Sequence, residues 1–206
     1  MTSFFDKNLI ETGGEMTKKA IGFTVVLISL IMAVPLSAKG PGAGKNGQSL
    51  GTLTDTEISH ITYIREEEKL ARDVYLTLYD LYQAPIFANI SESEQRHMDA
   101  LKNLIDKHGL IDPVADDSIG AFTNSHIDDL YDTLVKRGVM SYCYALQVGI
   151  DIEVIDIADI ESALNEEDEV VAKDVTRVFN NLLNGSYNHL NAFTSQYESN
   201  NCKEEF

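Results

Sequence analysis

The chain of 206 residues has no tryptophan, four prolines, two cysteines and few basic residues, 16 Lys and Arg against 33 Asp and Glu. The resulting net charge of −17 excludes the basic surface that nucleic-acid binding requires. Two cysteines far apart in the sequence cannot supply the paired spacing of a structural zinc site or a CxxC redox motif. With 44% hydrophobic and 24% charged residues, the composition is that of one globular domain with an accessory segment.

The longest apolar run lies near the amino terminus. Residues 20–36 are continuously apolar, follow two lysines and precede small residues that end at Ala38. This pattern predicts a secretory signal peptide over residues 1–38. The run is shorter than the ~20 residues that span a bilayer comfortably, but left uncleaved it would be a membrane anchor. Translation starts at Met1 or Met16, and either start places the folded part outside the cytoplasm, in the periplasm or extracellular space.

Two polar segments flank the folded part. Residues 39–53 are rich in glycine without apolar periodicity and are predicted to be a flexible linker. Residues 199–206 are polar and are predicted to be a frayed tail. In an exported protein, Cys143 and Cys202 could form a disulfide, and two separate thiols are the alternative.

Four long amphipathic segments lie between the linker and the tail, and no stretch alternates as a strand does. A capping box over residues 54–57 begins the first helix, and a proline begins the second. The predicted long helices cover residues 54–82, 85–108, 141–164 and 166–198.

The connections between these segments indicate their topology. The first two helices are joined by a few residues and must be antiparallel neighbours. Residues 109–140, with a short extra helix over 125–138, form a long crossover that can return the chain and make the third helix parallel to the second. The sequence therefore predicts an all-α protein, an antiparallel four-helix bundle over residues 54–198 with one long crossover between its second and third helices.

Polar residues interrupt the apolar stripe of each predicted long helix near its middle. Glu94 and His97, for example, fall in heptad register with Ile90 and Leu101. A charge buried without a partner is costly, so the fold must compensate for such residues. One polar residue in a core is commonly just hydrogen-bonded, but six at one level of a bundle indicate a metal site. The six candidate ligands are Glu68, Glu94, His97, Glu153, Asp156 and His189.

Carboxylates and imidazoles are ligands of non-haem iron and manganese. Four carboxylates balance the charge of two divalent ions, which explains how all four can be buried. A carboxylate can also bridge two metals about 3.5–4 Å apart, and Glu94 or Glu153 is expected to do so.

Other residues near the candidate ligands receive simpler interpretations. Tyr75 lies on the stripe two turns after Glu68, where it is a hydrogen-bond donor to the site, a radical-capable phenol or an ordinary packed ring. Glu66 and Glu67 fall off the stripe and are expected to be solvated.

These segments resemble the ferritin-like di-iron superfamily over about residues 55–198. Residues 68–75, EKLARDVY, are similar to the first helix of rubrerythrin-type proteins, in which the glutamate is a ligand. Residues 94–97, EQRH, match the Glu-x-x-His of their second helix. Residues 145–160 and 185–193 resemble an exported branch of the superfamily whose function is uncharacterised.

One position departs from this pattern. The fourth helix of the superfamily carries a second Glu-x-x-His, and this chain has Ser186 three residues before His189. Serine is a poor iron ligand, so one carboxylate is missing. We hypothesise that Asp156, one turn after Glu153 on the facing helix, restores the count, with Ser186 beside it. The alternative is a second metal position that is weaker or open.

The resemblance implies two iron ions, or manganese, and an oxidase, peroxidase or ferroxidase that reacts with dioxygen or peroxide. An external reductant would be required, because no cysteine-rich iron site follows the bundle. One alternative is a protein that stores or sequesters metal, or uses it for stability, without turnover. Another is a scaffold whose buried polar network only fixes helix register. The sequence does not determine the oligomeric state, and a homodimer is one possibility.

Overall fold

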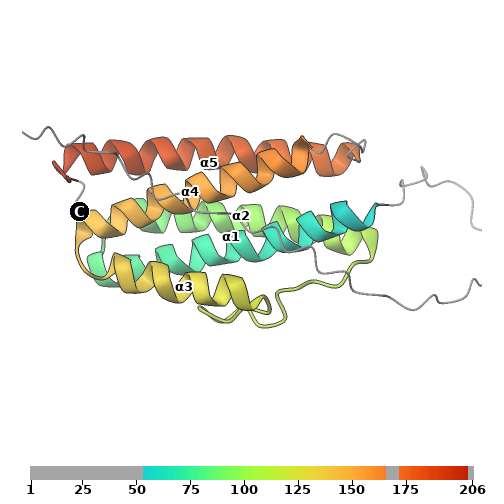
Figure 1. The fold of residues 1–206 in the computed structure, drawn as a ribbon, viewed down its shortest axis with the longest axis horizontal. Coiled ribbons are helices and arrows are strands. Elements are labelled where there is room, and N and C mark those ends of the chain that lie inside the picture. The colour runs from blue at the N-terminus through green and yellow to red at the C-terminus, as the bar shows by residue number, and fades with distance from the viewer. Residues whose placement is uncertain (1–52, 166–171, 204–206) are drawn as a thin grey trace, which may run out of the picture. The chain divides into compact units, whose positions relative to one another are not determined.

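The computed structural model describes residues 53–165 and 172–203, which form five helices and no strand (Figure 1). The all-helical class predicted from the sequence is therefore confirmed. The predicted signal peptide, all but the last residue of the predicted linker and the predicted start of the fourth long helix lie outside the described residues. Within the described ranges, no helix has the length and apolar character needed to cross a membrane. The helices are α1 (Asp55–Tyr82), α2 (Pro85–His108), α3 (Ser125–Gly138), α4 (Tyr142–Leu164) and α5 (Lys173–Ser199).

Local sequence signals account for the helix ends. The Thr54 side chain accepts a hydrogen bond from the Glu57 amide, and the Glu57 carboxylate accepts one from the Thr54 amide, which begins α1. Pro85 stands in the first turn of α2, and Gly109 ends that helix with a φ of +68°, a conformation that favours glycine. The Ser141 side chain caps α4 by accepting a hydrogen bond from the Tyr144 amide.

The four long helices pack as neighbours in a closed arrangement. α1 packs on α2 and α4, and α5 packs on α4 and α2. Figure 1 shows α2 and α4 running in one direction and α1 and α5 in the other. The chain achieves this because residues 109–124 and α3 carry it back along the molecule before α4 begins. α3 itself packs on α1 and α4.

Buried charges on α1 hold the connection between α2 and α3. Asp73 accepts hydrogen bonds from Lys69, Arg72 and the Gly120 amide, and all three charged side chains are buried. Lys69 also donates to the carbonyl of Ser118 at 2.8 Å. The connection is thus fastened to α1 by charge-assisted hydrogen bonds.

The prediction that Glu66 and Glu67 are solvated is wrong, because both are about 5% exposed or less. Glu66 accepts hydrogen bonds from the amides of Thr123 and Asn124, immediately before α3. Glu67 faces Asp159 of α4. The apolar periodicity of one helix cannot show that a second face is buried. Here that face is covered by the connection before α3 and by α4.

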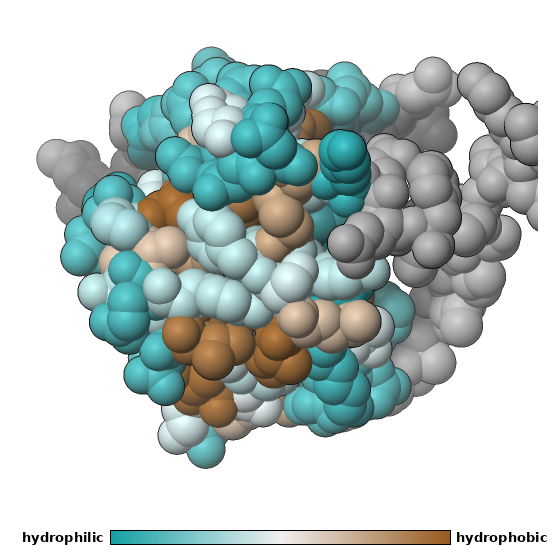
Figure 2. Space-filling model, turned by 90° about the vertical axis from the view of Figure 1, so that its left-hand side faces the viewer, coloured by the Kyte–Doolittle hydropathy of each residue, from teal (hydrophilic) through white to brown (hydrophobic). Residues whose placement is uncertain are grey.

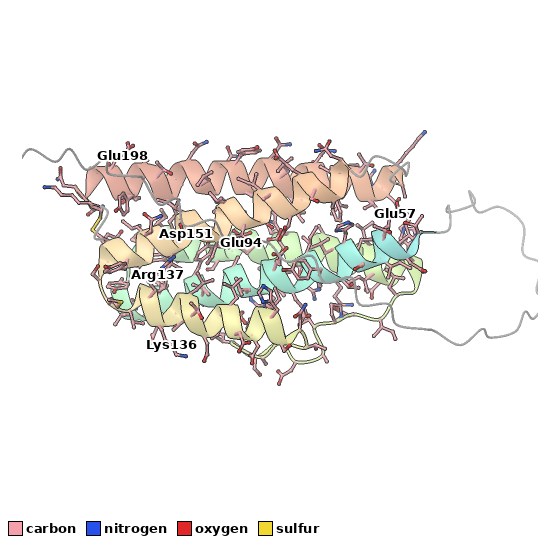
Figure 3. The ribbon with its side chains drawn as sticks, in the orientation of Figure 1. Glu57, Glu94, Lys136, Arg137, Asp151 and Glu198 are labelled. Carbon is pink, nitrogen blue, oxygen red and sulfur yellow. A yellow bond between two sulfur atoms is a disulfide. The ribbon has the colours of Figure 1, made fainter. Side chains whose placement is uncertain are left out.

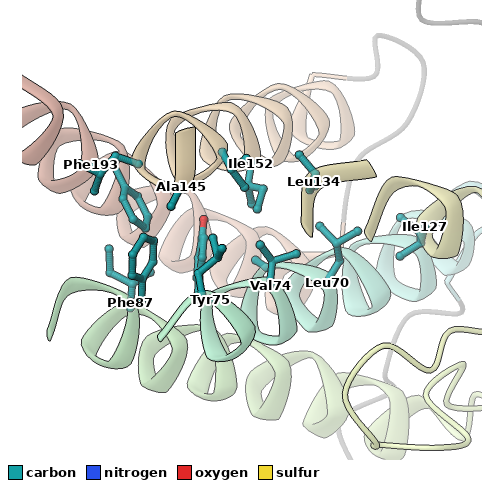
Figure 4. Close-up of a cluster of buried hydrophobic side chains, with 14 residues drawn as sticks. Leu70, Val74, Tyr75, Phe87, Ile127, Leu134, Ala145, Ile152 and Phe193 are labelled. Atoms are coloured by element: carbon teal, nitrogen blue, oxygen red, sulfur yellow. The ribbon is translucent and has the colours of Figure 1, made fainter. Parts of the chain in front are cut away.

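The hydrophobic core consists of two separate clusters. The first lies around Tyr75, Phe87 and Phe193 and extends to α3 (Figure 4). The second lies around Ile64 and Phe179, towards the other end of the long helices. On each long helix the candidate metal ligands fall between residues of the two clusters, so a polar layer separates two apolar ones.

A disulfide joins Cys143, in the first turn of α4, to Cys202, just after α5. The sequence left the pairing open between this disulfide and two separate thiols. The bond holds the carboxyl-terminal segment to the bundle as far as Cys202, within the stretch predicted to be frayed, and the Cys202 amide donates to the Tyr197 carbonyl at 3.1 Å.

Large hydrophobic side chains remain exposed at the same end of the molecule. Figure 2 faces this end and shows a hydrophobic area among hydrophilic residues. Leu81 in the last turn of α1, and Val139 and Met140 between α3 and α4, are each about half exposed or more.

Candidate metal centre

The structure brings all six predicted ligands together at one level of the long helices. α1 contributes one residue, α2 and α4 two each, and α5 one, together with the predicted neighbour Ser186. All are buried except His97, whose side chain is 12% exposed. Figure 3 places Glu94 in the middle of the helices. The residues are Glu68, Glu94, His97, Glu153, Asp156 and His189.

Five of these residues form two groups that share one carboxylate. In the first group, Nδ1 of His97 lies 3.2 Å from Glu68 Oε2 and 2.8 Å from Glu94 Oε2. In the second, Nδ1 of His189 lies 2.8 Å from Glu94 Oε1 and 3.5 Å from Glu153 Oε2. Glu94 therefore presents one oxygen to each imidazole, the geometry of a bridging carboxylate.

Several atoms of this cluster are buried without a hydrogen-bond partner. Oε1 of Glu68, Oε1 of Glu94, Oδ1 of Asp156 and Nδ1 of His189 are in this state. His189 Nδ1 and Glu94 Oε1 do not meet the geometry of a hydrogen bond, but they form an ion pair with each other at 2.8 Å. Each unpaired buried polar atom costs about 1–3 kcal/mol, so Oε1 of Glu68 and Oδ1 of Asp156, which also have no ion-pair partner among the described residues, call for a compensating group. Ligand atoms that converge in this way fit a pair of cations that each atom would contact directly.

Asp156 lies beside these two groups and is held from α5. The Ser186 hydroxyl donates a hydrogen bond to Asp156 Oδ2 at 2.5 Å, and Oδ1 remains without a partner. The serine found in place of the expected carboxylate thus contacts the aspartate that we expected to replace it.

Tyr75 is in contact with a candidate ligand. Its hydroxyl donates a hydrogen bond of 2.6 Å to Glu153 Oε1, and its ring packs against Phe87 and Phe193. Figure 4 shows the Tyr75 oxygen pointing from α1 towards α4. The sequence left several roles open for Tyr75. In the structure its hydroxyl is a hydrogen-bond donor that orients Glu153, and its ring packs in the core.

Gly185 makes room for an imidazole, a role that the sequence did not reveal. A Cβ at this position would lie 2.5 Å from Nε2 of His97 on the neighbouring helix. Only glycine therefore lets α5 approach the His97 ring at its present position. The only sequence signal was a glycine inside a predicted helix one turn before His189, which favours close packing.

The imidazoles and the shared carboxylate stabilise one another's charges. Burial opposes ionisation of Glu94, but the imidazoles of His189 and His97, each 2.8 Å from one of its oxygens, lower its pKa to about 2. Burial also opposes the charge on the imidazoles, yet carboxylates around them raise the pKa of His97 to about 11 and that of His189 to about 9. Without a cation, protons on the two imidazoles therefore balance the negative charge of Glu94.

The remaining carboxyl groups keep their protons to higher pH than usual. Burial, with the charge of Glu94, raises the pKa of Glu153 to about 8. Burial also raises the pKa of Asp156 to about 7, against the hydrogen bond from Ser186. Burial raises the pKa of Glu68 well above its usual value. Strongly shifted pKa values gathered in one cluster are typical of functional sites.

Comparison with known proteins identifies relatives. Residues 57–205 match the family described as "Uncharacterized protein domain (DUF2202)". The uncharacterized protein MJ0754 of Methanocaldococcus jannaschii is 49% identical over 141 residues, which are 68% of this chain and 75% of that protein. The crystal structure of the hypothetical protein MJ0754 from Methanococcus jannaschii has a TM-score of 0.71 at 43% identity, covering 78% of this chain and 89% of that one. The chain therefore belongs to the DUF2202 family.

Proposed function

We propose that this chain is a ferritin-like four-helix bundle protein that holds two metal ions, iron or alternatively manganese, and reacts with dioxygen or peroxide. Oxidase, peroxidase and ferroxidase activities all fit such a centre. The observation that carries the proposal is the pair of three-residue groups that share Glu94. Each group has two carboxylates and one imidazole, which is a donor set of non-haem iron.

The positions of the side chains support a role for each proposed ligand. Glu68 and His97 would hold one ion, Glu153 and His189 the other, and Glu94 would bridge them. Asp156 is a further carboxylate, oriented by Ser186 through a hydrogen bond. The four carboxylates balance two divalent ions, which removes the cost of burying them.

The bound metals would supply the one-electron redox chemistry, and the chain would supply the surroundings. Tyr75 fixes the orientation of Glu153 through its hydroxyl. The two hydrophobic clusters exclude water above and below the polar layer. His97 keeps limited contact with solvent, where a small oxidant can approach. Electrons must come from an external reductant, because both cysteines of the chain are in a disulfide.

We also propose that the protein is exported. Residues 1–38 have the pattern of a signal peptide, and the segment would be a membrane anchor if it is not cleaved. The disulfide supports export, because such bonds form and persist mainly in oxidising compartments.

The decisive experiment is anaerobic loading of the purified protein with Fe(II), followed by dioxygen or peroxide. We expect two Fe(II) per chain and oxidation faster than that of free Fe(II) under the same conditions. The Glu94→Gln variant should lose both properties, and Glu92→Gln, on the exposed face of α2, should keep them. Oxidation no faster than for free metal would exclude the enzyme.

A second candidate function is metal storage or sequestration without turnover. It is favoured by Ser186, which stands where the related pattern has a glutamate and leaves one carboxylate fewer on α5. In that case the protein would bind two ions per chain and protect Fe(II) from oxidation. If the purified protein contains no metal and takes none up, both metal-binding functions are excluded. The hypothesis of a structural scaffold then remains.

A further inference from the structure

Three large hydrophobic side chains are exposed at the end of the bundle where α1 finishes and α3 passes into α4. They are Leu81, Val139 and Met140, which we call the end patch, and Met140 is 66% exposed. Figure 2 faces this end of the molecule and shows the hydrophobic area among hydrophilic residues. Single exposed hydrophobic residues are common, but several gathered at one place indicate an interface.

Contacts between the last turn of α1 and the turn before α4 hold the end patch together. The Tyr82 hydroxyl donates a hydrogen bond of 2.9 Å to the Gly138 carbonyl, and the centre of the Tyr82 ring lies 5.5 Å from that of Tyr142. Tyr82 directly follows Leu81, and Gly138 directly precedes Val139. The patch therefore lies on segments that are already fixed to each other, which lowers the cost of ordering them when a partner binds.

Charges beside the end patch nearly cancel. Within three residues of the patch in the sequence, the charged residues are Asp80, Lys136 and Arg137. Lys136 forms an ion pair of 3.0 Å with Asp132, and Arg137 forms one with Asp151. Each pair is neutral, so the charge of Asp80 is what remains beside the patch. The whole chain, by contrast, carries a net charge of −17.

This balance decides which partner fits the end patch. A chain with this net charge repels a second copy over most of its surface, but not at an end where the charges cancel. Binding to an anionic membrane surface would be favoured by a cluster of free basic residues. The two basic residues nearest the patch are already paired with acids. A hydrophobic patch is also complementary to itself across a two-fold axis, so a second copy is the favoured partner.

We propose that the end patch is the contact through which two copies of this chain form a symmetric dimer. The end of a helical bundle about 20–25 Å across offers about 500 Å² per copy, below the ~800 Å² per partner of a standard interface. The dimer is therefore reversible. The inference goes beyond the proposed function and does not depend on it, because none of the proposed metal ligands belongs to the end patch.

The test is sedimentation equilibrium of the purified protein over a series of concentrations. We expect the wild type to be a mixture of monomer and dimer, and Met140→Glu to weaken the dimer at least about tenfold, because a charge would be desolvated in the contact. The matched control is Ile111→Glu, at an 88% exposed position just after α2. It should associate as the wild type does. Both variants should keep the wild-type thermal stability as monomers, because both side chains are exposed.

A second measurement tests the symmetry of the contact. Met140→Glu and Met140→Lys should each be chiefly monomeric, because each places like charges in the same interface. Mixing the two variants should restore dimers, since the charges are then opposite. Dimers that fail to form in this mixture would overturn the symmetric contact at Met140.

The remaining outcomes overturn the proposal and leave the metal centre untouched. A wild type that stays monomeric up to about 0.1 mM would show that the end patch does not join two copies. A dimer of undiminished affinity in Met140→Glu would place the contact elsewhere on the surface. Binding of monomeric wild type to phosphatidylcholine vesicles, lost in Met140→Glu, would assign the patch to a membrane surface instead.

Discussion

The Ser186 hydroxyl of α5 holds the Asp156 carboxylate of α4 by a hydrogen bond of 2.5 Å to Oδ2. Oδ1 of the same aspartate is buried and unpaired. The serine therefore orients a carboxylate on the facing helix. In the Glu-x-x-His pattern that this segment resembles, the same position is a glutamate. Ser186 therefore contributes to the proposed centre indirectly, through its hydrogen bond to Asp156.

The first prediction concerns Asp156. We expect Asp156→Ala to lower the affinity of one of the two metal ions by about 10–100-fold, because a carboxylate beside the ion is lost. Ser186→Ala keeps the carboxylate and should cost less, about tenfold or under. Competition with a chromophoric chelator measures both. Two ions bound by Asp156→Ala with wild-type affinity would show that the aspartate does not replace the missing ligand.

The second prediction concerns the shared carboxylate. Glu94→Gln removes an oxygen anion from both three-residue groups, so we expect it to weaken both ions by more than about 100-fold. Glu68→Gln and Glu153→Gln should each weaken chiefly one ion. Metal content after equilibrium dialysis distinguishes these patterns. Equal losses from all three variants would contradict the assignment of Glu94 as the bridge.

The third prediction concerns Gly185. A Cβ there would lie 2.5 Å from His97 Nε2, so Gly185→Ala must displace that ring and reduce metal affinity. Gly149→Ala is the matched control, because its Cβ would lie 2.6 Å from the Phe193 ring in the first hydrophobic cluster. Both variants should lose about 1–3 kcal/mol of stability through overpacking. Only the first should also lose metal at equal folded fraction.

The fourth prediction concerns pH. In the metal-free protein the pKa values of Glu153 and Asp156 rise from 4.5 and 3.8 to about 8 and 7, and those of His97 and His189 rise from 6.5 to about 11 and 9. The folded protein therefore binds more protons than the unfolded chain between pH 5 and 9, and its stability must fall as pH rises.

Thermal unfolding at a series of pH values tests this linkage. We expect Tm of the metal-free protein to fall between pH 5 and 9 by about 5 °C or more, because 1 kcal/mol shifts Tm by about 2–4 °C in a chain of this size. The low pKa of Glu94 adds no slope in this range, since that group is ionised in both states. With saturating Mn(II) the slope should vanish or reverse, because cations replace the protons. A metal-free Tm that rises with pH would contradict the charge assignment.

The fifth prediction concerns the disulfide. Cys143 and Cys202 close a loop with a sequence separation of 59 residues. In the chain-entropy description, loss of such a bond costs about 4 kcal/mol of stability. We expect the Cys143→Ser/Cys202→Ser variant to unfold at lower denaturant concentration and to bind two metal ions as before. Loss of metal from folded protein would show that the disulfide also positions the centre.

The sequence predicts the polar layer well because its residues follow the apolar period of each helix. Glu68 and Glu94 stand out against hydrocarbon neighbours on both sides along their helices. On α5 two successive residues face the polar layer, because Gly185 lies against the His97 ring and Ser186 is buried beside Asp156. An α-helix has 3.6 residues per turn, so a strict seven-residue count drifts around the helix.

Other features depend on residues far away in the sequence. Glu67 is buried by packing between α1 and α4, which no periodicity on α1 encodes. The disulfide forms because α4 and α5 run in opposite directions and place Cys143 near Cys202. Such contacts follow from the topology of the whole bundle and cannot be read from one helix.

The polar layer also has a consequence for folding. Because it divides the apolar core, the metal-free protein has two hydrophobic clusters on either side of a layer that contains buried acids and imidazoles. Bound ions would link all four long helices at the polar layer. The two hydrophobic clusters would then unfold together as one cooperative unit. Without metal, the opening free energies measured by amide hydrogen exchange around Phe87 and around Phe179 should differ, because each cluster opens independently. With metal bound, the two values should become equal.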